Sequence, residues 1–188
     1  MKVSYSNLEK GSKIILNNQP YQIIECSPMF KGRGSSVLRA KIKNLITEEI
    51  FSYTFQSSDV LEQAEIEKFL AQFIYSHRDK FVFVKKNKER ITLSSDQVKE
   101  KIDFLKPNQE VEIVIFKDKI VNINLPIKLQ LKVIEAPPGV KGDRSQAGTK
   151  LITLETGAKI NVPLFIKKGD IIEINTERRE YTKRIETE

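Results

Sequence analysis

The chain has 188 residues, of which 39% are hydrophobic and 30% are charged, and a formal net charge of +7. This composition is typical of a globular protein rather than a disordered one, and no apolar run is long enough to form a membrane helix. The length favours two or three small modules. The positive charge favours a polyanionic partner, or serves solubility alone. Because the excess charge is spread evenly along the chain, any nucleic-acid binding must depend on local clusters of cations.

Short runs of alternating polar and apolar residues, broken by turn residues, predict a small β-barrel over residues 1–63. The stretch SKIILNNQPYQIIEC indicates a strand, an Asn-Asn turn and a second strand. Further along, EIFSYTF places three aromatic side chains on one face of a strand: Phe51, Tyr53 and Phe55. Such a stripe can stack nucleic-acid bases, but at strand spacing it more often belongs to the core.

Residues 27–44, SPMFKGRGSSVLRAKIKN, contain five cations and no acid. In the tip of this predicted hairpin, Gly32 and Gly34 allow positive φ angles and close approach to another surface, and Arg33 lies between them. Lys31 adds a charge beside the tip. Alternation then places Val37 with three cations on one face of the following strand: Arg39, Lys41 and Lys43. The other face carries Leu38, Ala40 and Ile42. Side chains of this kind bind phosphates, although a solvated basic hairpin has the same pattern.

A second module is expected over residues 64–127. FIYSH and KFVFV look like strands, and SSDQVKEKIDFL looks helical, with Ser94 and Gln97 in the spacing of a capping box. EVEIVIF and IVNINLP form a hairpin around KDK, and Pro126 marks the end of the module.

A third module of five short strands is expected over residues 128–188, in the manner of an OB-type barrel. Its second and third strands form a hairpin that turns at Glu155-Thr156-Gly157. Its long polar loop, PPGVKGDRSQAGTK, carries three cations that are candidates for RNA phosphate binding: Lys141, Arg144 and Lys150. The second and third modules have a similar strand rhythm, which suggests two related barrels.

No metal, cofactor or catalytic site is predicted. Cys26 is the only cysteine and His77 the only histidine, so neither a disulfide nor a zinc site is supported. The sequence leaves a Cys26–His77 dyad open, but nothing orients the two side chains. KGRGSS lacks the spacing of a nucleotide-binding P-loop. Because the N-terminus lacks the apolar core of a signal peptide, we expect a cytoplasmic protein.

At this point a resemblance becomes clear. APPGVKGDRSQAGTKLITLETGAKINVPLFIKKGDIIEINTERREYTKR is similar to the C-terminal signature of the bacterial elongation factor P family, relatives of initiation factor 5A. GSKIILNNQPYQIIE and KGRGSSVLRAKIKNL resemble its first domain, and the middle block matches by length and pattern. The usual tip of the family is Pro-Gly-Lys-Gly. Lys31 stands at the proline here and Arg33 at the lysine that many members modify.

The resemblance implies a mostly β, L-shaped protein of three barrels, an SH3/KOW-like barrel followed by two OB-fold barrels. It implies a translation factor, not an enzyme, that binds the ribosome beside peptidyl-tRNA and stimulates peptide-bond formation at stalled polyproline sequences. A monomer without cofactor is expected. Whether Arg33 or Lys31 is modified, and by which enzyme, is left open. The alternative from the residues is a generic single-stranded RNA-binding protein built on OB barrels.

Overall fold

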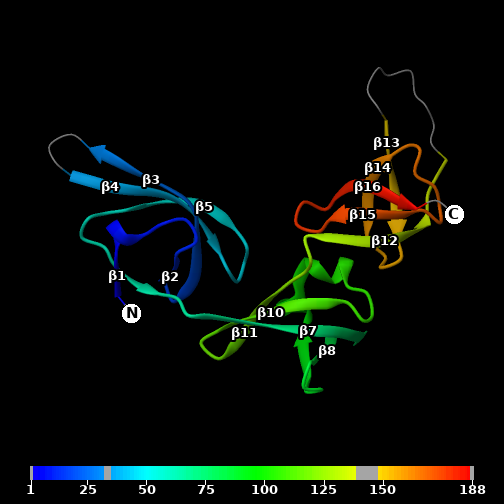
Figure 1. Ribbon diagram of the computed structural model, residues 1–188, viewed down its shortest axis with the longest axis horizontal. Helices are drawn as coiled ribbons and strands as arrows, with labels where there is room; N and C mark the ends of the chain where they lie inside the picture. Colours follow the sequence, from blue (N-terminus) through cyan, green and yellow to red (C-terminus); the bar gives the residue numbers. More distant parts are fainter. Residues whose placement is uncertain (1, 32–34, 139–147, 187–188) are drawn as a thin grey trace. The chain divides into compact units, whose positions relative to one another are not determined.

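The structure is a computed structural model, and it describes residues 2–31, 35–138 and 148–186. In these ranges the chain forms sixteen strands, one short α-helix and two 3-10 helices (Figure 1). The strands are arranged in three sheets, as the sequence predicts for a chain of three β domains. None of the described helices is long and apolar enough to span a membrane.

The first sheet has the spatial order β1-β6-β2-β3-β4-β5. Its strands are β1 (Lys2–Ser4), β2 (Lys13–Leu16), β3 (Gln19–Lys31), β4 (Ser35–Asn44), β5 (Ile50–Phe55) and β6 (Val60–Gln63). The predicted turn between β2 and β3 is confirmed, with φ of 47° at Asn17 and 65° at Asn18. Asparagine accepts this left-handed conformation more readily than most residues, so the pair closes a tight hairpin.

The core of the first sheet confirms most of the predicted alternation along β4. Leu38, Ala40 and Ile42 are buried, whereas Arg39 and Lys41 are exposed. The buried side chains join a cluster that also contains Ile14, Ile23 and Phe55. Val37 departs from the prediction, because it lies on the face of the cations and is nevertheless only 6% exposed.

The expectation that the aromatic stripe of β5 belongs to the core is right only for Phe55. Phe55 is fully buried, but Phe51 is 42% and Tyr53 is 37% exposed. The reason is the position of β5 at the edge of the sheet, with β4 as its sole strand neighbour in the sheet order. The rings of Phe51 and Tyr53 are therefore covered on one side, by Tyr21 and Phe55 respectively.

The second sheet has the order β11-β10-β7-β8-β9. Its strands are β7 (Ile66–His77), β8 (Lys80–Lys85), β9 (Arg90–Ser94), β10 (Glu110–Phe116) and β11 (Lys119–Asn124). The predicted capping box is present, since the backbone N–H of Ser94 donates to Oε1 of Gln97 over 3.1 Å. The predicted helix is shorter than expected. The α-helix α1 (Ser95–Val98) stops at Lys99, whose φ is 52°, and continues as the 3-10 helix η2 (Lys99–Phe104).

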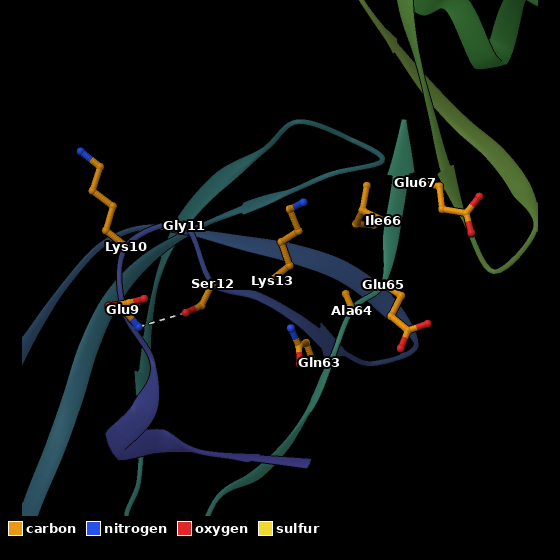
Figure 2. Close-up of a pocket in the computed structure, with 10 residues that line it drawn as sticks. All are labelled: Glu9, Lys10, Gly11, Ser12, Lys13, Gln63, Ala64, Glu65, Ile66 and Glu67. Atoms are coloured by element: carbon orange, nitrogen blue, oxygen red, sulfur yellow. Dashed lines mark hydrogen bonds between the residues drawn. The ribbon is translucent and has the colours of Figure 1, made fainter. Parts of the chain in front are cut away.

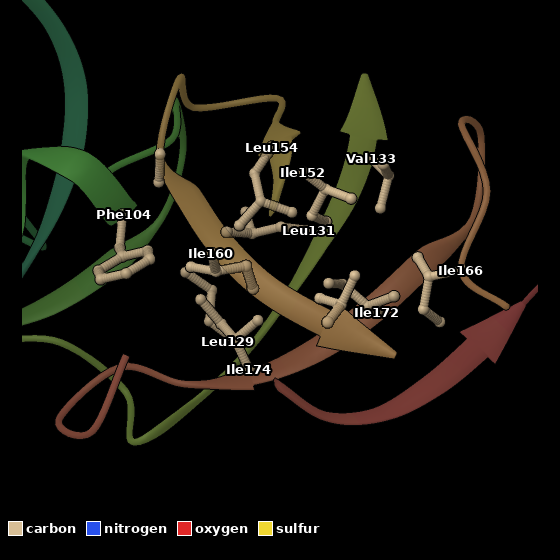
Figure 3. Close-up of a cluster of buried hydrophobic side chains, with 12 residues drawn as sticks. Phe104, Leu129, Leu131, Val133, Ile152, Leu154, Ile160, Ile166, Ile172 and Ile174 are labelled. Carbon is tan, nitrogen blue, oxygen red and sulfur yellow. The ribbon is translucent and has the colours of Figure 1, made fainter. Parts of the chain in front are cut away.

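The third sheet has the order β14-β13-β12-β15-β16. Its strands are β12 (Lys128–Glu135), β13 (Thr149–Leu154), β14 (Lys159–Pro163), β15 (Ile171–Asn175) and β16 (Glu180–Glu186). The predicted turn at residues 155–157 is confirmed, with a φ of 89° at Gly157. Strands β14 and β16 approach one another, so the sheet curls around its apolar face. Figure 3 shows this core, to which η2 contributes Phe104.

The second and third sheets have the same strand order. If the strands of each sheet are numbered by sequence, both sheets read 5-4-1-2-3 across. In each, the first strand is central and pairs with both the second and the fourth. The shared order agrees with the expectation of two related barrels.

Contacts along the chain divide it into two compact units, residues 1–69 with 113–122 and residues 70–112 with 123–188. The end of the β10–β11 hairpin thus belongs with the first sheet. Nζ of Lys117 donates to Oδ1 of Asn18 over 2.9 Å, and Nδ2 of Asn122 to the carbonyl oxygen of Leu45 over 3.3 Å. The domain boundaries at 63/64 and 127/128 stay predictions.

Candidate nucleic-acid interface

The hairpin of β3 and β4 extends well beyond the core of the first sheet (Figure 1). Its antiparallel pairing runs from Tyr21 opposite Asn44 to Lys31 opposite Ser35, with a register shift between Ile23 and Glu25. Residues 27–30 are all exposed, although their backbone is paired. On β4, Val37 and Leu38 lie opposite Met29 and Pro28 and are buried, so the exposed surface of this end comes from the side chains of β3. Backbone hydrogen bonds keep these exposed β3 residues ordered.

The predicted tip of this hairpin, with Gly32, Arg33 and Gly34, lies outside the described residues. Lys31 is described by its backbone alone, as the last residue of β3. The structure shows the course of β3 and β4, the two strands that lead to the tip.

The three predicted cations of β4 differ in their surroundings. Nζ of Lys41 lies 2.9 Å from a carboxylate oxygen of Glu25, and Nζ of Lys43 lies 3.8 Å from one of Glu48. The hydrogen bond from Lys41 lowers the pKa of Glu25 below its ordinary value of 4.5. The side chain of Arg39 has neither a hydrogen bond nor an acidic partner among the described residues. Its guanidinium is thus the cation of this strand most readily offered to a phosphate.

A contact that the sequence does not reveal braces the same hairpin. The hydroxyl groups of Tyr5 and Ser36 are 2.8 Å apart, a hydrogen bond between residues 31 positions apart in the chain. Tyr5 lies in the 3-10 helix η1 (Tyr5–Asn7) and packs against the core of the first sheet. The second residue of β4 is thereby tied to the domain body.

The second candidate segment, the loop before β13, is described at its ends. Lys141 and Arg144 lie outside the described residues. Lys150 is in β13, and its Nζ donates to the carbonyl oxygen of Pro137 over 2.9 Å. This bond joins the two ends of the loop, so Lys150 has a structural contact as well as its predicted role at RNA.

The cations of the last hairpin contact acidic side chains. Arg179 pairs with Glu100 at 3.3 Å and with Asp103, and its guanidinium lies over the ring of Phe104. Arg184 lies 3.9 Å from Asp170 and over the ring of Phe165. These contacts connect η2 and the turn before β15 to the end of the chain, which favours a structural role for both arginines.

A shallow cleft of about 610 Å³ lies beside the first sheet (Figure 2). Its lining is mostly polar and charged: Glu9, Lys10, Gly11, Ser12, Lys13, Gln63, Ala64, Glu65, Ile66 and Glu67. In Figure 2 the charged side chains are spread along the cleft, with Lys10 and Glu67 at opposite ends. The arrangement has no group of polar atoms that converges on one point, as a catalytic site requires.

Groups that could hold a metal are absent from the described ranges, where no three His, Cys, Asp or Glu side chains come together. Cys26 is half-buried, and its Sγ donates to the carbonyl oxygen of Leu8 over 3.8 Å. His77 is exposed at the end of β7, opposite Lys80.

Three family models match the chain in succession. The model described as Elongation factor P (EF-P) KOW-like domain matches residues 4–61, and Elongation factor P (EF-P) OB domain matches residues 66–123. Elongation factor P, C-terminal, matches residues 129–184. Together they cover most of the described chain.

Curated relatives match over nearly their full length. An elongation factor P of Hydrogenobaculum sp. (strain Y04AAS1) is 35% identical over 98% of this chain and 96% of its own. One of Phytoplasma australiense is 40% identical over 97% of both chains. Among solved structures, eukaryotic translation initiation factor 5A from Methanococcus jannaschii is similar at 18% identity and a TM-score of 0.49, over 65% of this chain and 93% of its own.

Proposed function

Because the chain belongs to the elongation factor P family, and is thus a translation elongation factor and not an enzyme, we propose that it binds the ribosome beside peptidyl-tRNA and stimulates peptide-bond formation at stalled polyproline sequences. The observation that carries the proposal is the match of all three domain models, in order, to one chain. Interaction with the ribosome and tRNA follows from the family itself.

In this proposal Arg33 is the residue that reaches the acceptor end of the tRNA. The exposed end of the β3–β4 hairpin supports it, because a narrow two-stranded element can approach RNA where a whole domain cannot. Gly32 and Gly34 keep the tip slender, and Lys31 adds charge beside it. A cation that holds the peptidyl-tRNA in a reactive geometry lowers the entropic part of the barrier without transferring a proton.

The remaining candidate residues would bind the RNA backbone. Arg39, Lys41 and Lys43 would follow phosphates from the hairpin, with Arg39 contributing most because Lys41 and Lys43 already contact acids. A second contact would come from the loop before β13: Lys141, Arg144 and Lys150. With this role we propose a cytoplasmic monomer of three domains, divided at 63/64 and 127/128, whose tip is the substrate of a modifying enzyme acting on Arg33 or Lys31.

The test is a reconstituted translation reaction on a message with consecutive proline codons. The full chain should raise the rate of peptide-bond formation, and Arg33→Ala should abolish the increase while the thermal unfolding midpoint stays unchanged. Lys106→Ala, a substitution of a half-buried cation in another domain, serves as control. Full activity of Arg33→Ala would exclude the assignment of Arg33 as the residue that reaches the tRNA.

Peptide mass spectrometry of protein from its native host would show whether Arg33 or Lys31 carries an added group.

The exposed rings of Phe51 and Tyr53 favour one alternative, a general single-stranded RNA-binding protein. Such a protein would bind free RNA tightly, with an affinity that falls steeply with salt. Tight binding to unstructured RNA in the absence of ribosomes, lost in Phe51→Leu, would support this alternative over the ribosomal role.

A further inference from the structure

Resting on the function proposed above, we propose that Phe30 is a stacking platform for an unpaired nucleobase at the acceptor end of the tRNA. Its side chain is 83% exposed, the largest exposed fraction among the large hydrophobic side chains that the structure describes. An aromatic ring that stands in water at the end of a paired strand contributes nothing to a core.

Phe30 differs from the other exposed phenylalanines in having no aromatic or cationic partner among the described residues. Phe51, which is 42% exposed, contacts the ring of Tyr21 at 5.7 Å between centroids. Phe165, which is 54% exposed, lies under the guanidinium of Arg184 at 5.3 Å. Within the described part of the chain, no ring contact or cation–π contact involves Phe30. Its flat face is thus open to a ligand.

The platform is held in place by the domain body. Phe30 lies opposite Ser36 in the register of β3 and β4. The Ser36 hydroxyl is in turn bonded to that of Tyr5, which packs against the first core. The contact anchors the strand pair at the position of Phe30, so the ring is presented on a fixed backbone. A preorganised aromatic ring loses little entropy when a base stacks on it.

The charge around the ring indicates what kind of partner it meets. Between Glu25 and Glu48 the sequence contains no acid and five cations. Arg39, on β4 of the same hairpin, has no acidic partner in the described residues. Phe30 pairs with Ser36 and Arg39 with Ser27, so the ring and the guanidinium project from opposite faces of the same narrow hairpin. A bare aromatic ring on a hairpin that carries unpaired positive charge is a combination that binds single-stranded nucleic acid, since the base stacks while the phosphates meet the cations. An apolar protein surface would match the ring but would leave the cations without counter-charges.

The experiment uses the full chain and ribosomes stalled with a peptidyl-tRNA whose terminal adenine is replaced by 2-aminopurine. Stacking on an aromatic ring quenches the fluorescence of this base. One set of reactions measures the quenching on addition of the factor, and a parallel set with unlabelled tRNA measures the rate of peptide-bond formation against factor concentration.

Three variants sharpen the result. Phe30→Leu should remove most of the quenching and raise the half-saturating factor concentration by about tenfold, as expected for the loss of one stacked base. Phe30→Tyr keeps the flat ring and should behave as the wild type. Tyr75→Leu removes a side chain that is 50% exposed in the second sheet, and it should leave both readouts unchanged.

The outcomes separate this inference from the proposed function. If the wild type accelerates the reaction and Phe30→Leu matches it in both readouts, the stacking platform is wrong and the proposed function stands. If Phe30→Leu loses rate but keeps the quenching, the ring contacts a protein and not a base, which also overturns the inference. If the wild type quenches the probe without accelerating the reaction, the proposed function fails and the stacking contact stands.

Discussion

The core of the third sheet and the free end of the β3–β4 hairpin are both built from antiparallel strands, but they are stabilised differently. In the third sheet, Leu131, Val133 and Leu154 are fully buried. In the hairpin, residues 27–30 are exposed although their backbone is paired. Apolar burial from every strand therefore stabilises the first region. In the second region only β4 contributes buried side chains, Val37 and Leu38, and ladder hydrogen bonds with one side-chain brace order the exposed residues of β3. The residues that we propose for recognition are thus not those that form the core of the third sheet, so we expect that stability and recognition can be changed separately.

The largest expected effect is on the buried side of this comparison. Leu131→Ala should lower the free energy of unfolding by about 3 kcal/mol, because it removes buried methyl groups and leaves a cavity. Urea unfolding followed by circular dichroism measures the change. Leu70→Ala removes the same atoms from a side chain that is 42% exposed, and it should cost less than about 1 kcal/mol. Equal losses for the two variants would contradict the assignment of the core.

A smaller effect is expected where the hairpin meets the domain body. Tyr5→Phe removes the hydroxyl that bonds Ser36 and should cost about 1 kcal/mol. Amide hydrogen exchange should accelerate at residues 29–30 and 36–38 and stay unchanged in the third sheet. Combining Tyr5→Phe with Ser36→Ala should cost no more than either alone, because both remove the same bond. Additive losses would show that the two hydroxyls act independently.

The cations of β4 allow a second test of the proposed recognition surface, because only some of them form ion pairs with acidic side chains. Arg39→Gln should weaken ribosome binding and reduce the slope of log affinity against log salt by about 1, as the loss of one phosphate contact would. Lys41→Gln should change the slope less, because Glu25 already neutralises Lys41. Titrations of binding between low and moderate salt measure both slopes. A larger change for Lys41→Gln would reverse the ranking of the two residues.

The smallest effect concerns the ion pair of Glu25 and Lys41, whose side chains are both exposed. Since the pair lowers the pKa of Glu25, its contribution is present above pH 4.5 and is lost as the pH falls through the lowered pKa. Lys41→Met should move the pKa of Glu25 back towards 4.5, as measured by NMR titration of the carboxyl carbon. Glu89, whose pKa is lowered by Lys85, should keep its own value and serves as the internal control.

Features set by neighbouring residues were predictable from the sequence. The Asn17-Asn18 turn, the turn at Gly157 and the capping box of Ser94 and Gln97 each depend on residues within a few positions of one another. The alternation along β4 also predicts which of its side chains are buried, apart from Val37. These elements follow from local backbone preferences and from the period of the strand.

Features that depend on distant residues were not predictable. The exposure of Phe51 and Tyr53 follows from the edge position of β5, which the order of strands in space determines. The bond between Tyr5 and Ser36 has no local signal, because the two residues are 31 positions apart. The partners of Lys41 and Lys43 were likewise missed, since the register shift in β3 decides that Glu25 lies opposite Lys41. For the tip itself, Arg33 was named from the glycines on either side of it, and the resemblance added its alignment with the lysine that many family members modify.

The shared strand order of the second and third sheets also constrains when each can form during synthesis. In both sheets the central strand pairs with the fourth strand. The pairing of β7 is therefore incomplete until β10 has been synthesised, and the pairing of β12 is incomplete until β15 has been synthesised. Such pairings between distant segments slow folding and leave a strand edge open until the later segment is made. The third sheet can therefore close only after β15 and β16 have been translated.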